Sequence, residues 1–346
     1  MVFSKLKFRR NTVFLFTFLV LSDCSTLSTG PQGPAEAKAR ITGVSDIERP
    51  RFPDITAIRP HWQAAAGSIS VSAGRIREGR LDYWALRIDL DGGPGNQMRI
   101  VAGGGGDAAA GHVLSTYVSS FVRDQGLWAG INAVPFDPSS AREGEDRRVA
   151  GLAVSAGRVI APPTARFDAL VFYGDRGAAI VSQGDIDSSG PVPQHGGRDI
   201  LHAAGGFHRI LRDGELTERA RQRRAGPRHA RSAAGLSGNG RILYLIAING
   251  GFPGRAGATE AETALILKAL GAQDALNLDG GGSAALALRF PADGNTDSNA
   301  NGNTDSNANG NADGNADGAV RILNTPAHAG FPGRERAVAV CLGFGP

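Results

Sequence analysis

One stretch, residues 276–286, constrains the fold and the function of this chain more than any other. Its polar and glycine residues are, in order, Asn277, Asp279, Gly280, Gly281, Gly282 and Ser283. A carboxylate beside glycines has no flanking side chains, so a ligand or another backbone is able to approach it closely. The N–H groups of a glycine run also converge readily on one anion. The simpler interpretation is a turn after a buried strand, and the preceding segments help to decide between the two.

Two apolar runs and a helical segment precede this stretch. Residues 243–248 and 275–278 have the length and composition of strands, and residues 259–270 have helical spacing. A strand, a helix and a second strand at these distances predict a βαβ crossover near residues 243–279 with parallel, neighbouring strands.

The ends of these segments support the prediction. Thr259 and Glu262 have the spacing of a capping box at the start of the helix, and Gly271 follows its end. Asn249 and Asp279 come directly after the two strands. We therefore expect both side chains at one edge of the sheet, where open α/β sheets bind their ligands.

The composition fits a turn-rich chain with a real core. The chain has 346 residues, 41% of them hydrophobic, and 49 glycines. This glycine content favours many short strands over a helical bundle, so the sequence predicts an α+β fold with a strand-dominated, mixed sheet and few helices. The net charge of +4 fits an anionic ligand and is too small to indicate nucleic acid as a partner.

The N-terminus has the pattern of an export signal. A basic start followed by a short apolar run predicts a signal peptide over residues 1–23. Cys24 follows in the position of a lipidated cysteine, so the chain is either anchored to a membrane through Cys24 or simply secreted. Residues 24–58 are interpreted as a flexible tether, and 59–346 as the folded domain. The other cysteine, Cys341, lies in an apolar run and is expected to be buried.

Residues 293–318 form an Asn/Asp/Gly-rich insert inside that domain. The insert lacks apolar residues, so it is expected to be disordered. Its repeats begin like a calcium loop, but Ala308 stands where a bidentate Glu is needed. This excludes an EF-hand and leaves weak calcium binding open. The seven histidines show no metal-ligand spacing, so no other metal or cofactor is predicted.

Three further polar residues stand out earlier in the chain. Asn132 and Asp137 flank a loop after a predicted strand, and their alternative is ordinary turn chemistry. Residues 218–231 are rich in arginine, and most of these arginines fit a solvated loop. Arg231 differs because it opens a strand, and its planar guanidinium suits two oxygens of a phosphate.

Together these motifs resemble the phosphodiester glycosidase family over roughly residue 83 to the C-terminus. The matching segments are, in chain order, Ile131-Asn132 with Phe136-Asp137, Ala203-Ala204-Gly205-Gly206, Arg231-Ser232-Ala233-Ala234-Gly235, Gly257-Ala258-Thr259 with Glu262, Asn277-Leu278-Asp279-Gly280-Gly281-Gly282-Ser283 and Glu335-Arg336-Ala337-Val338-Ala339. In two places the chain departs from the family pattern. Residues 133–135 replace glycines, and Asn249 stands where many members carry Asp.

The resemblance implies hydrolysis of a sugar-1-phosphodiester at the sugar carbon, with a sugar-phosphate or polysaccharide of the cell envelope as substrate. Such a site needs a carboxylate for water or for an oxocarbenium-like centre, and a cation for the phosphate. The catalytic candidates are Asp279 as carboxylate, Arg231 as phosphate clamp, and Asn132 and Asn277 as polar positioners. The substrate-binding candidates are Asp137, Ser232, Gly280, Gly281, Gly282, Ser283, Glu262 and Arg336.

Simpler roles stand beside these assignments. Glu262 also fits a helix cap, and Arg336 fits a charge at a strand edge. Asn249 in place of an acid favours a non-catalytic lipoprotein that binds sugar-phosphate or polysaccharide. A structural envelope protein that uses the Asn/Asp/Gly insert for contacts is the third interpretation.

Overall fold

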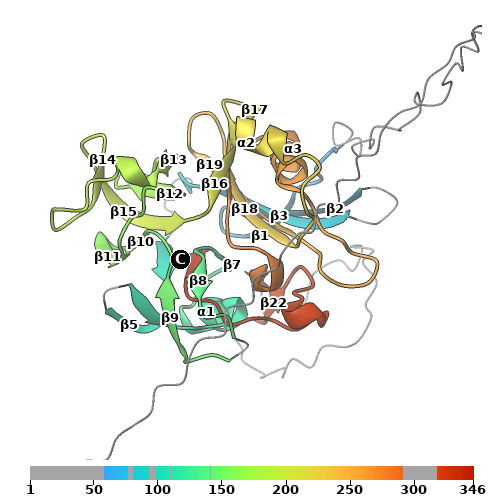
Figure 1. Cartoon of the computed structure of the whole chain (residues 1–346), viewed down its shortest axis with the longest axis horizontal. Helices are drawn as coiled ribbons and strands as arrows, with labels where there is room; N and C mark the ends of the chain where they lie inside the picture. The colour runs from blue at the N-terminus through green and yellow to red at the C-terminus, as the bar shows by residue number, and fades with distance from the viewer. Residues whose placement is uncertain (1–57, 77–80, 93–98, 110, 141, 291–317) are drawn as a thin grey trace, which may run out of the picture. The chain divides into compact units, whose positions relative to one another are not determined.

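Short strands joined by tight turns dominate the part of the chain that the structure describes, as the glycine content predicts, and there they form four sheets (Figure 1). A computed structural model describes residues 58–76, 81–92, 99–109, 111–140, 142–290 and 318–346. All of them belong to one unit, Arg51–Pro346. The predicted signal peptide with Cys24, almost all of the tether and almost all of the insert at 293–318 lie outside the described residues.

The largest sheet has eight strands. In spatial order they are β1 (Gln63–Ala66), β2 (Ile69–Ile76), β3 (Leu81–Asp89), β19 (Ile242–Ile248), β18 (Arg231–Leu236), β20 (Asp274–Asn277), β16 (His208–Arg212) and β17 (Glu215–Leu216). The described strands pair antiparallel throughout. The α+β class and the dominance of strands predicted from the sequence are confirmed.

The predicted crossover is present, but one feature of it is wrong. β19 and β20 both pair antiparallel with β18, so they run parallel to each other and are joined by α3 (Glu260–Leu270). They are not neighbours, because β18 lies between them. β18 and β19 are consecutive strands and form a hairpin, so β18 pairs directly with β19 and separates it from β20.

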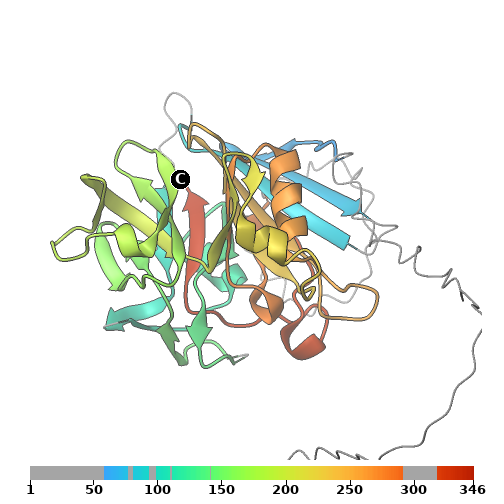
Figure 2. The ribbon, with the colours of Figure 1, turned by 45° about the horizontal axis from the view of Figure 1, so that its top comes forward.

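The large sheet is covered on both faces, which explains why β19 is apolar along its whole length. Leu243 and Leu245 belong to a core shared with the five-stranded sheet, whereas Ile246 and Ile248 pack in the core under α3. Figure 2 shows α3 lying along the strands of this sheet. The helix begins at the predicted capping box and ends at Gly271, whose φ is 117°.

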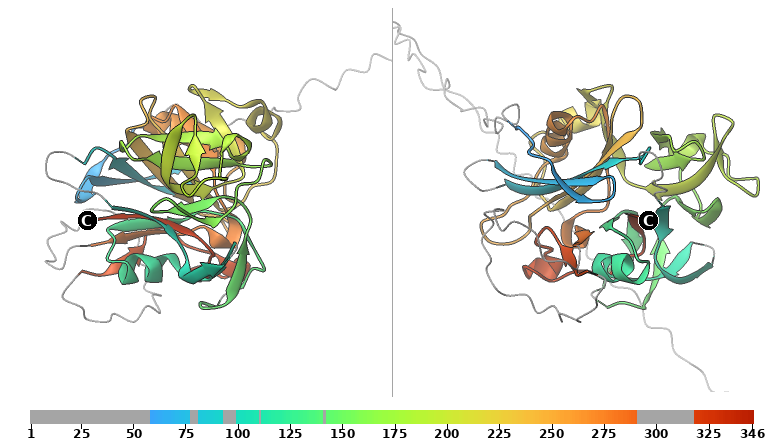
Figure 3. Two further views of the ribbon diagram at one scale, coloured as in Figure 1. Left: turned by 90° about the vertical axis from the view of Figure 1, so that its left-hand side faces the viewer. Right: turned by 180° about the vertical axis from the view of Figure 1, so that it is seen from behind.

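The other sheets are smaller. The five-stranded sheet, which includes the red C-terminal strand in Figure 3, contains β22 (Val320–Ile322), β21 (Leu286–Arg289), β7 (Ala129–Asn132), β23 (Cys341–Gly345) and β4 (Arg99–Gly103). Cys341 is buried in this sheet, as expected. The six-stranded sheet contains β11 (Arg158–Ala161), β10 (Ala153–Ser155), β15 (Arg198–Gly205), β12 (Asp168–Tyr173), β13 (Ala178–Ser182) and β14 (Gln194–His195). The four-stranded sheet contains β5 (Gly105–Ala109), β6 (His112–Leu114), β9 (Asp146–Val149) and β8 (Phe136–Asp137).

In the described part of the chain, the remaining regular structure consists of two short helices and the 3₁₀ turns η2 (Gln183–Asp185), η3 (Gly281–Ser283) and η4 (His328–Gly330). α1 (Val118–Asp124) buries Val118, Phe121 and Val122 against the five-stranded sheet. α2 (Glu218–Gln222) lies where a solvated loop was expected. It forms because Thr217 caps its first turn and Ala220 is buried under it. Within the described residues, no helix combines the length and the apolar character needed to cross a membrane.

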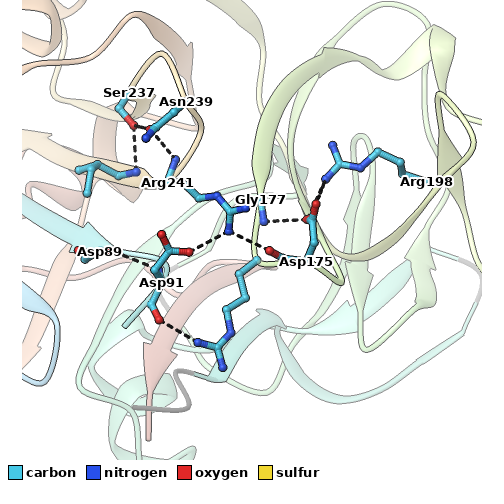
Figure 4. A network of polar contacts seen from close by, with 10 residues as sticks. Asp89, Asp91, Asp175, Gly177, Arg198, Ser237, Asn239 and Arg241 are labelled. Atoms are coloured by element: carbon cyan, nitrogen blue, oxygen red, sulfur yellow. Dashed lines mark hydrogen bonds and ion pairs between the residues drawn. The ribbon is translucent and has the colours of Figure 1, made fainter. Parts of the chain in front are cut away.

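A polar network joins the large sheet to the six-stranded sheet (Figure 4). Arg241, in the turn between β18 and β19, donates to Asp91 Oδ1 at 2.8 Å and to the carbonyl of Asp175 at 2.9 Å. Asp175 in turn accepts from Arg198 at 2.7 Å. These side chains are largely exposed, so each ion pair stabilises the fold by at most about 1 kcal/mol.

Candidate active site

The Asp279 turn is the point where the large sheet meets the five-stranded sheet. β20 ends at Asn277, and the chain then turns through the glycines into η3. A Cβ atom at Gly280 would lie 2.8 Å from the carbonyl oxygen of Ala230, and one at Gly282 would lie 2.6 Å from Nη2 of Arg336. Glycine is therefore needed at both positions because a backbone and a guanidinium approach so closely.

Asn132 fixes the backbone of this turn. Its Nδ2 donates to the carbonyl of Asp279 at 2.6 Å, and its Oδ1 accepts from Ser232 Oγ at 2.6 Å and from the N–H of Ala285 at 3.1 Å. Asn132 and Ser232 are both completely buried, at 0% exposure. Residues from β7, β18 and the glycine turn therefore meet at one amide, and the loss of that amide would leave several buried groups unpaired.

The Asp279 carboxyl group is poised between burial and three stabilising contacts. Burial raises its pKa from 3.8 to about 6, while the Ser283 hydroxyl, the Arg336 charge and the Gly280 backbone each act to lower the pKa. A carboxyl with a pKa near 6 is ionised at neutral pH and is still able to exchange protons there.

Arg336 is the cation on one side of this carboxyl. Its Nη1 donates to Ser283 Oγ at 3.2 Å, and its Nε donates to Nδ1 of His328 at 2.9 Å. Burial lowers the pKa of Arg336, whereas the charge of Asp279 raises it. Arg336 is thus a half-buried cation held by side chains from η3 and η4 rather than the free strand-edge charge that its sequence also allowed.

Arg231 and Asn277 lie on the other side. The strand register pairs Ala233 with Asn277, so counting on by two residues places position 279 opposite Arg231. The Cα of Arg231 is 3.7 Å from where a Cβ at Gly280 would lie. The Arg231 guanidinium points to the chain behind the turn, where it donates to the carbonyls of Ala258 at 3.0 Å and Pro227 at 3.4 Å.

The side chain of Asn277 is buried on β20, the strand that precedes the turn. Its side chain is 3% exposed, and its Oδ1 has no hydrogen-bond partner within the part of the chain that the structure describes. Its cross-strand neighbour on β16 is His208. His208 also lines a polar hollow of about 610 Å³ between β16, β17 and α2. Asn277 itself does not line this hollow, and its Oδ1 is buried beneath the surface.

The comparison with protein families decides the assignment of the whole chain. A sequence model of the phosphodiester glycosidases matches residues 125–345, which include every residue described at the site above. The chain belongs to the phosphodiester glycosidase family. Family membership indicates a hydrolase that acts on phosphodiester-linked sugars.

Solved structures show the same fold at low identity. The catalytic domain of zebrafish N-acetylglucosamine-1-phosphodiester α-N-acetylglucosaminidase, auto-inhibited by its pro-peptide, is 17% identical with a TM-score of 0.53. The match covers 84% of this chain and 89% of the zebrafish one. A hypothetical protein from Synechocystis is 16% identical with a TM-score of 0.53, over 83% of this chain and 64% of its own. None of the curated proteins matches this chain in sequence.

Two predicted site residues make their contacts away from the Asp279 carboxyl. Glu262 is completely buried at the start of α3, where it closes the capping box with Thr259 and pairs with Arg228 at 2.5 Å. Asp137 is exposed on β8 and faces Arg148 of β9 at 3.6 Å. The contacts of Glu262 are those of a helix cap, and those of Asp137 belong to the edge of the four-stranded sheet.

Two histidines near the Asp279 turn, His328 and His208, were not predicted from the sequence. Each is a lone histidine without a motif, so no local signal marks it, and only the chain fold brings it to the turn. In the described residues, no group of His, Cys, Asp and Glu side chains is arranged to hold a metal ion. The calcium prediction concerns the insert at 293–318, which lies almost entirely outside the described residues.

Proposed function

We propose that this phosphodiester glycosidase is an active hydrolase that cleaves the bond between the sugar carbon and the phosphate of a sugar-1-phosphodiester. The observation that carries the proposal is the Asp279 carboxyl, which is desolvated to a pKa of about 6 and has Arg336 beside it. N-acetylglucosamine is our candidate sugar, because the zebrafish protein of the same fold is named for that substrate.

The chemistry of the leaving group suits these residues. The phosphate monoester that departs has a second pKa of about 6, so it leaves readily as an anion and needs little help from a general acid. The reaction needs a carboxylate for the attacking water or for the developing positive charge at the sugar carbon, and Asp279 supplies it. It also needs cations for the departing phosphate, and the two arginines that flank the turn, Arg231 and Arg336, supply them.

The amides have supporting roles in this scheme. Asn132 keeps the backbone of the Asp279 turn in place through its 2.6 Å contact with the Asp279 carbonyl. Asn277 is buried on β20, and in this scheme it supports the strand that leads into the Asp279 turn. Ser232 holds Asn132, and Ser283 connects Arg336 to Asp279, so both act through their neighbours.

The test is hydrolysis of a nitrophenyl phosphodiester of N-acetylglucosamine 1-phosphate in water enriched in ¹⁸O. Cleavage at the sugar carbon releases free sugar that carries the label and leaves nitrophenyl phosphate unlabelled. Cleavage at phosphorus would instead release nitrophenol and put the label into phosphate, which would exclude a glycosidase. The variant Asp279→Asn should remain folded and lose turnover by about a thousandfold or more. Full activity in that variant would falsify the role of Asp279.

A non-catalytic sugar-phosphate or polysaccharide-binding protein is the second candidate, and one contact favours it. Asn249 replaces an acid found in many relatives, and its Oδ1 is occupied by the N–H of Thr325 at 2.7 Å. The amide oxygen therefore ties two loops together. Binding of the phosphodiester without release of sugar would support this candidate.

The compartment and the natural substrate belong to the same proposal. A basic start, a short apolar run and Cys24 favour export to the bacterial envelope, with a lipid anchor at Cys24 or free secretion. The substrate would then be a sugar-phosphate of an envelope polysaccharide or glycoconjugate. Labelling cells with a radioactive fatty acid and comparing the wild type with Cys24→Ser separates anchoring from secretion.

A further inference from the structure

We propose that His328 is a positioning residue of this site, whose neutral ring accepts the Nε–H of Arg336 and holds the guanidinium against the Asp279 turn. This inference rests on the proposed function, because it assigns a role in the same reaction. His328 belongs to none of the motifs that placed the chain in its family.

The hydrogen bond fixes which ring nitrogen carries the proton. Arg336 Nε lies 2.9 Å from Nδ1 of His328, and a guanidinium has only donors. Nδ1 must therefore be the acceptor, so the ring is neutral with its proton on Nε2. A doubly protonated ring would have no acceptor for Arg336.

The arginine is thereby held from two directions. Nε is bound to His328 and Nη1 to Ser283 Oγ at 3.2 Å. A long side chain fixed at two nitrogens loses little freedom when it takes up a phosphate, and its remaining N–H groups keep one orientation. Nη2 lies where only a glycine at 282 leaves it room.

The backbone around His328 is built to hold the ring. Its N–H donates to the carbonyl of Arg334 at 3.0 Å, and its carbonyl accepts from Phe331 at 3.1 Å. The next residue, Ala329, has a φ of 55°, a left-handed conformation that is unusual for a residue with a Cβ. Such local strain persists only where surrounding contacts impose it, and it is common beside functional groups.

The charges around His328 all favour the neutral ring. Burial lowers the pKa of His328, and the positive charges of Arg336 and Arg334 lower it further. η3, which packs against η4, contributes glycines and Ser283 and no charge. Asp279 acts on Arg336 and not on His328 among the described interactions. Protonation of His328 in acid would therefore remove the acceptor for Arg336 Nε–H and release the guanidinium from its position.

The experiment compares two substitutions of His328 with a matched control. His328→Asn keeps an oxygen acceptor near the place of Nδ1 and cannot titrate, whereas His328→Leu removes the acceptor. The control is His112→Leu, because His112 is a histidine of the four-stranded sheet that contacts Asp146 and no residue of the site. Each protein is assayed for release of sugar from the phosphodiester between pH 5 and pH 8, and its thermal unfolding is recorded.

We expect His328→Leu to lower kcat/KM about tenfold, the usual cost of losing one hydrogen bond to a charged group. His328→Asn should recover activity to within about threefold of the wild type and should lose less activity between pH 6 and pH 5. An Arg336→Lys background lacks the Nε–H donor, so adding His328→Leu there should lower kcat/KM further by less than about twofold. A purely structural role would move neither the pH profile nor this coupling.

Activity of His328→Leu equal to that of the His112→Leu control would overturn the proposal. So would an equal loss from His328→Leu in the wild-type background and in the Arg336→Lys background. If the wild type releases no sugar at all, the proposed function has failed, and calorimetric binding of N-acetylglucosamine 1-phosphate then tests His328. His328→Leu should weaken that binding about tenfold, and unchanged binding would reject the inference independently of turnover.

Discussion

The two sides of Asp279 are built differently. On the Arg336 side, side chains contact one another directly: Ser283 and Arg336 act on the carboxyl, and His328 holds the arginine. On the Arg231 side, the guanidinium is bound to main-chain carbonyls, and Asn277 keeps an open acceptor.

This difference separates two tasks. The Arg336 side opposes the effect of burial on the pKa of the carboxyl, and its contacts are in place without a ligand, as electrostatic stabilisation requires. The Arg231 side holds the turn mainly through the main chain.

Removal of the cation on the preorganised side should have the largest effect. Arg336→Ala should lower kcat/KM by about a hundredfold to a thousandfold, because it deletes the charge next to the reacting carboxyl. Steady-state kinetics with the phosphodiester measure this loss, and thermal unfolding serves as the control for folding. A smaller loss than that of Arg231→Ala would reverse the assignment of the two sides.

The Asn132 amide supports the backbone of the Asp279 turn, so its loss should lower the stability of the fold. Asn132→Ala should lower the free energy of unfolding by about 3 kcal/mol, since Ser232 and the N–H of Ala285 lose their buried partner. Urea denaturation of the variant and the wild type measures the difference. Ser232→Ala is the matched control: it removes one of these bonds and should cost about 1–2 kcal/mol. Equal stability of Asn132→Ala and the wild type would contradict the anchoring role.

The raised pKa of Asp279 predicts a pH dependence of stability. A carboxyl that holds its proton more tightly when folded makes the protein more stable in acid, and this contribution is lost as pH rises from about 4 to about 6. Burial also raises the pKa of Glu335 to about 6, so both groups act in the same window. Asp279→Asn should remove its own share, on the order of 2 kcal/mol after allowance for partial solvation. Urea denaturation at pH 4.5, 5.5 and 6.5 measures the slope, and an unchanged slope in Asp279→Asn would refute this interpretation.

The cation on the other side should matter less for turnover. Arg231→Ala should lower kcat/KM only about tenfold, because its guanidinium is bound to the carbonyls of Ala258 and Pro227 and only its remaining donors would be able to bind a phosphate. Arg231→Lys should not restore activity, since a single ammonium replaces neither the fork nor its contacts. A loss confined to KM would indicate that Arg231 binds the phosphate equally in the ground state and the transition state.

The smallest effect concerns the helix behind Arg231. Glu262→Gln should lower the free energy of unfolding by about 1 kcal/mol, because the pair with Arg228 is lost while an oxygen remains for the capping box. Thr259→Ala removes the other half of the box and should cost about as much. Chemical denaturation of both variants gives the two values. A drop in turnover far beyond the drop in stability would place Glu262 in the site after all.

Part of this picture was predictable from local sequence. The capping box, Gly271 and the strands around residues 245 and 275 follow from spacing and chain conformation alone, and each is found within about two residues of the expected bounds. α2 was missed because an arginine-rich segment hides a cap at Thr217 and one buried alanine. The place of β18 was missed because hairpin pairing competes with the crossover, and spacing does not rank the two.

The local sequence is enough to predict an acid and three glycines in a turn after a buried strand, because such a turn needs glycine whatever surrounds it. Which groups reach that acid depends on contacts between distant parts of the chain. Asn132 and Arg336 are separated from Asp279 by 147 and 57 positions in the chain, so their approach depends on how the sheets pack. The pKa of about 6 has the same origin, since desolvation comes from neighbours that are distant in sequence.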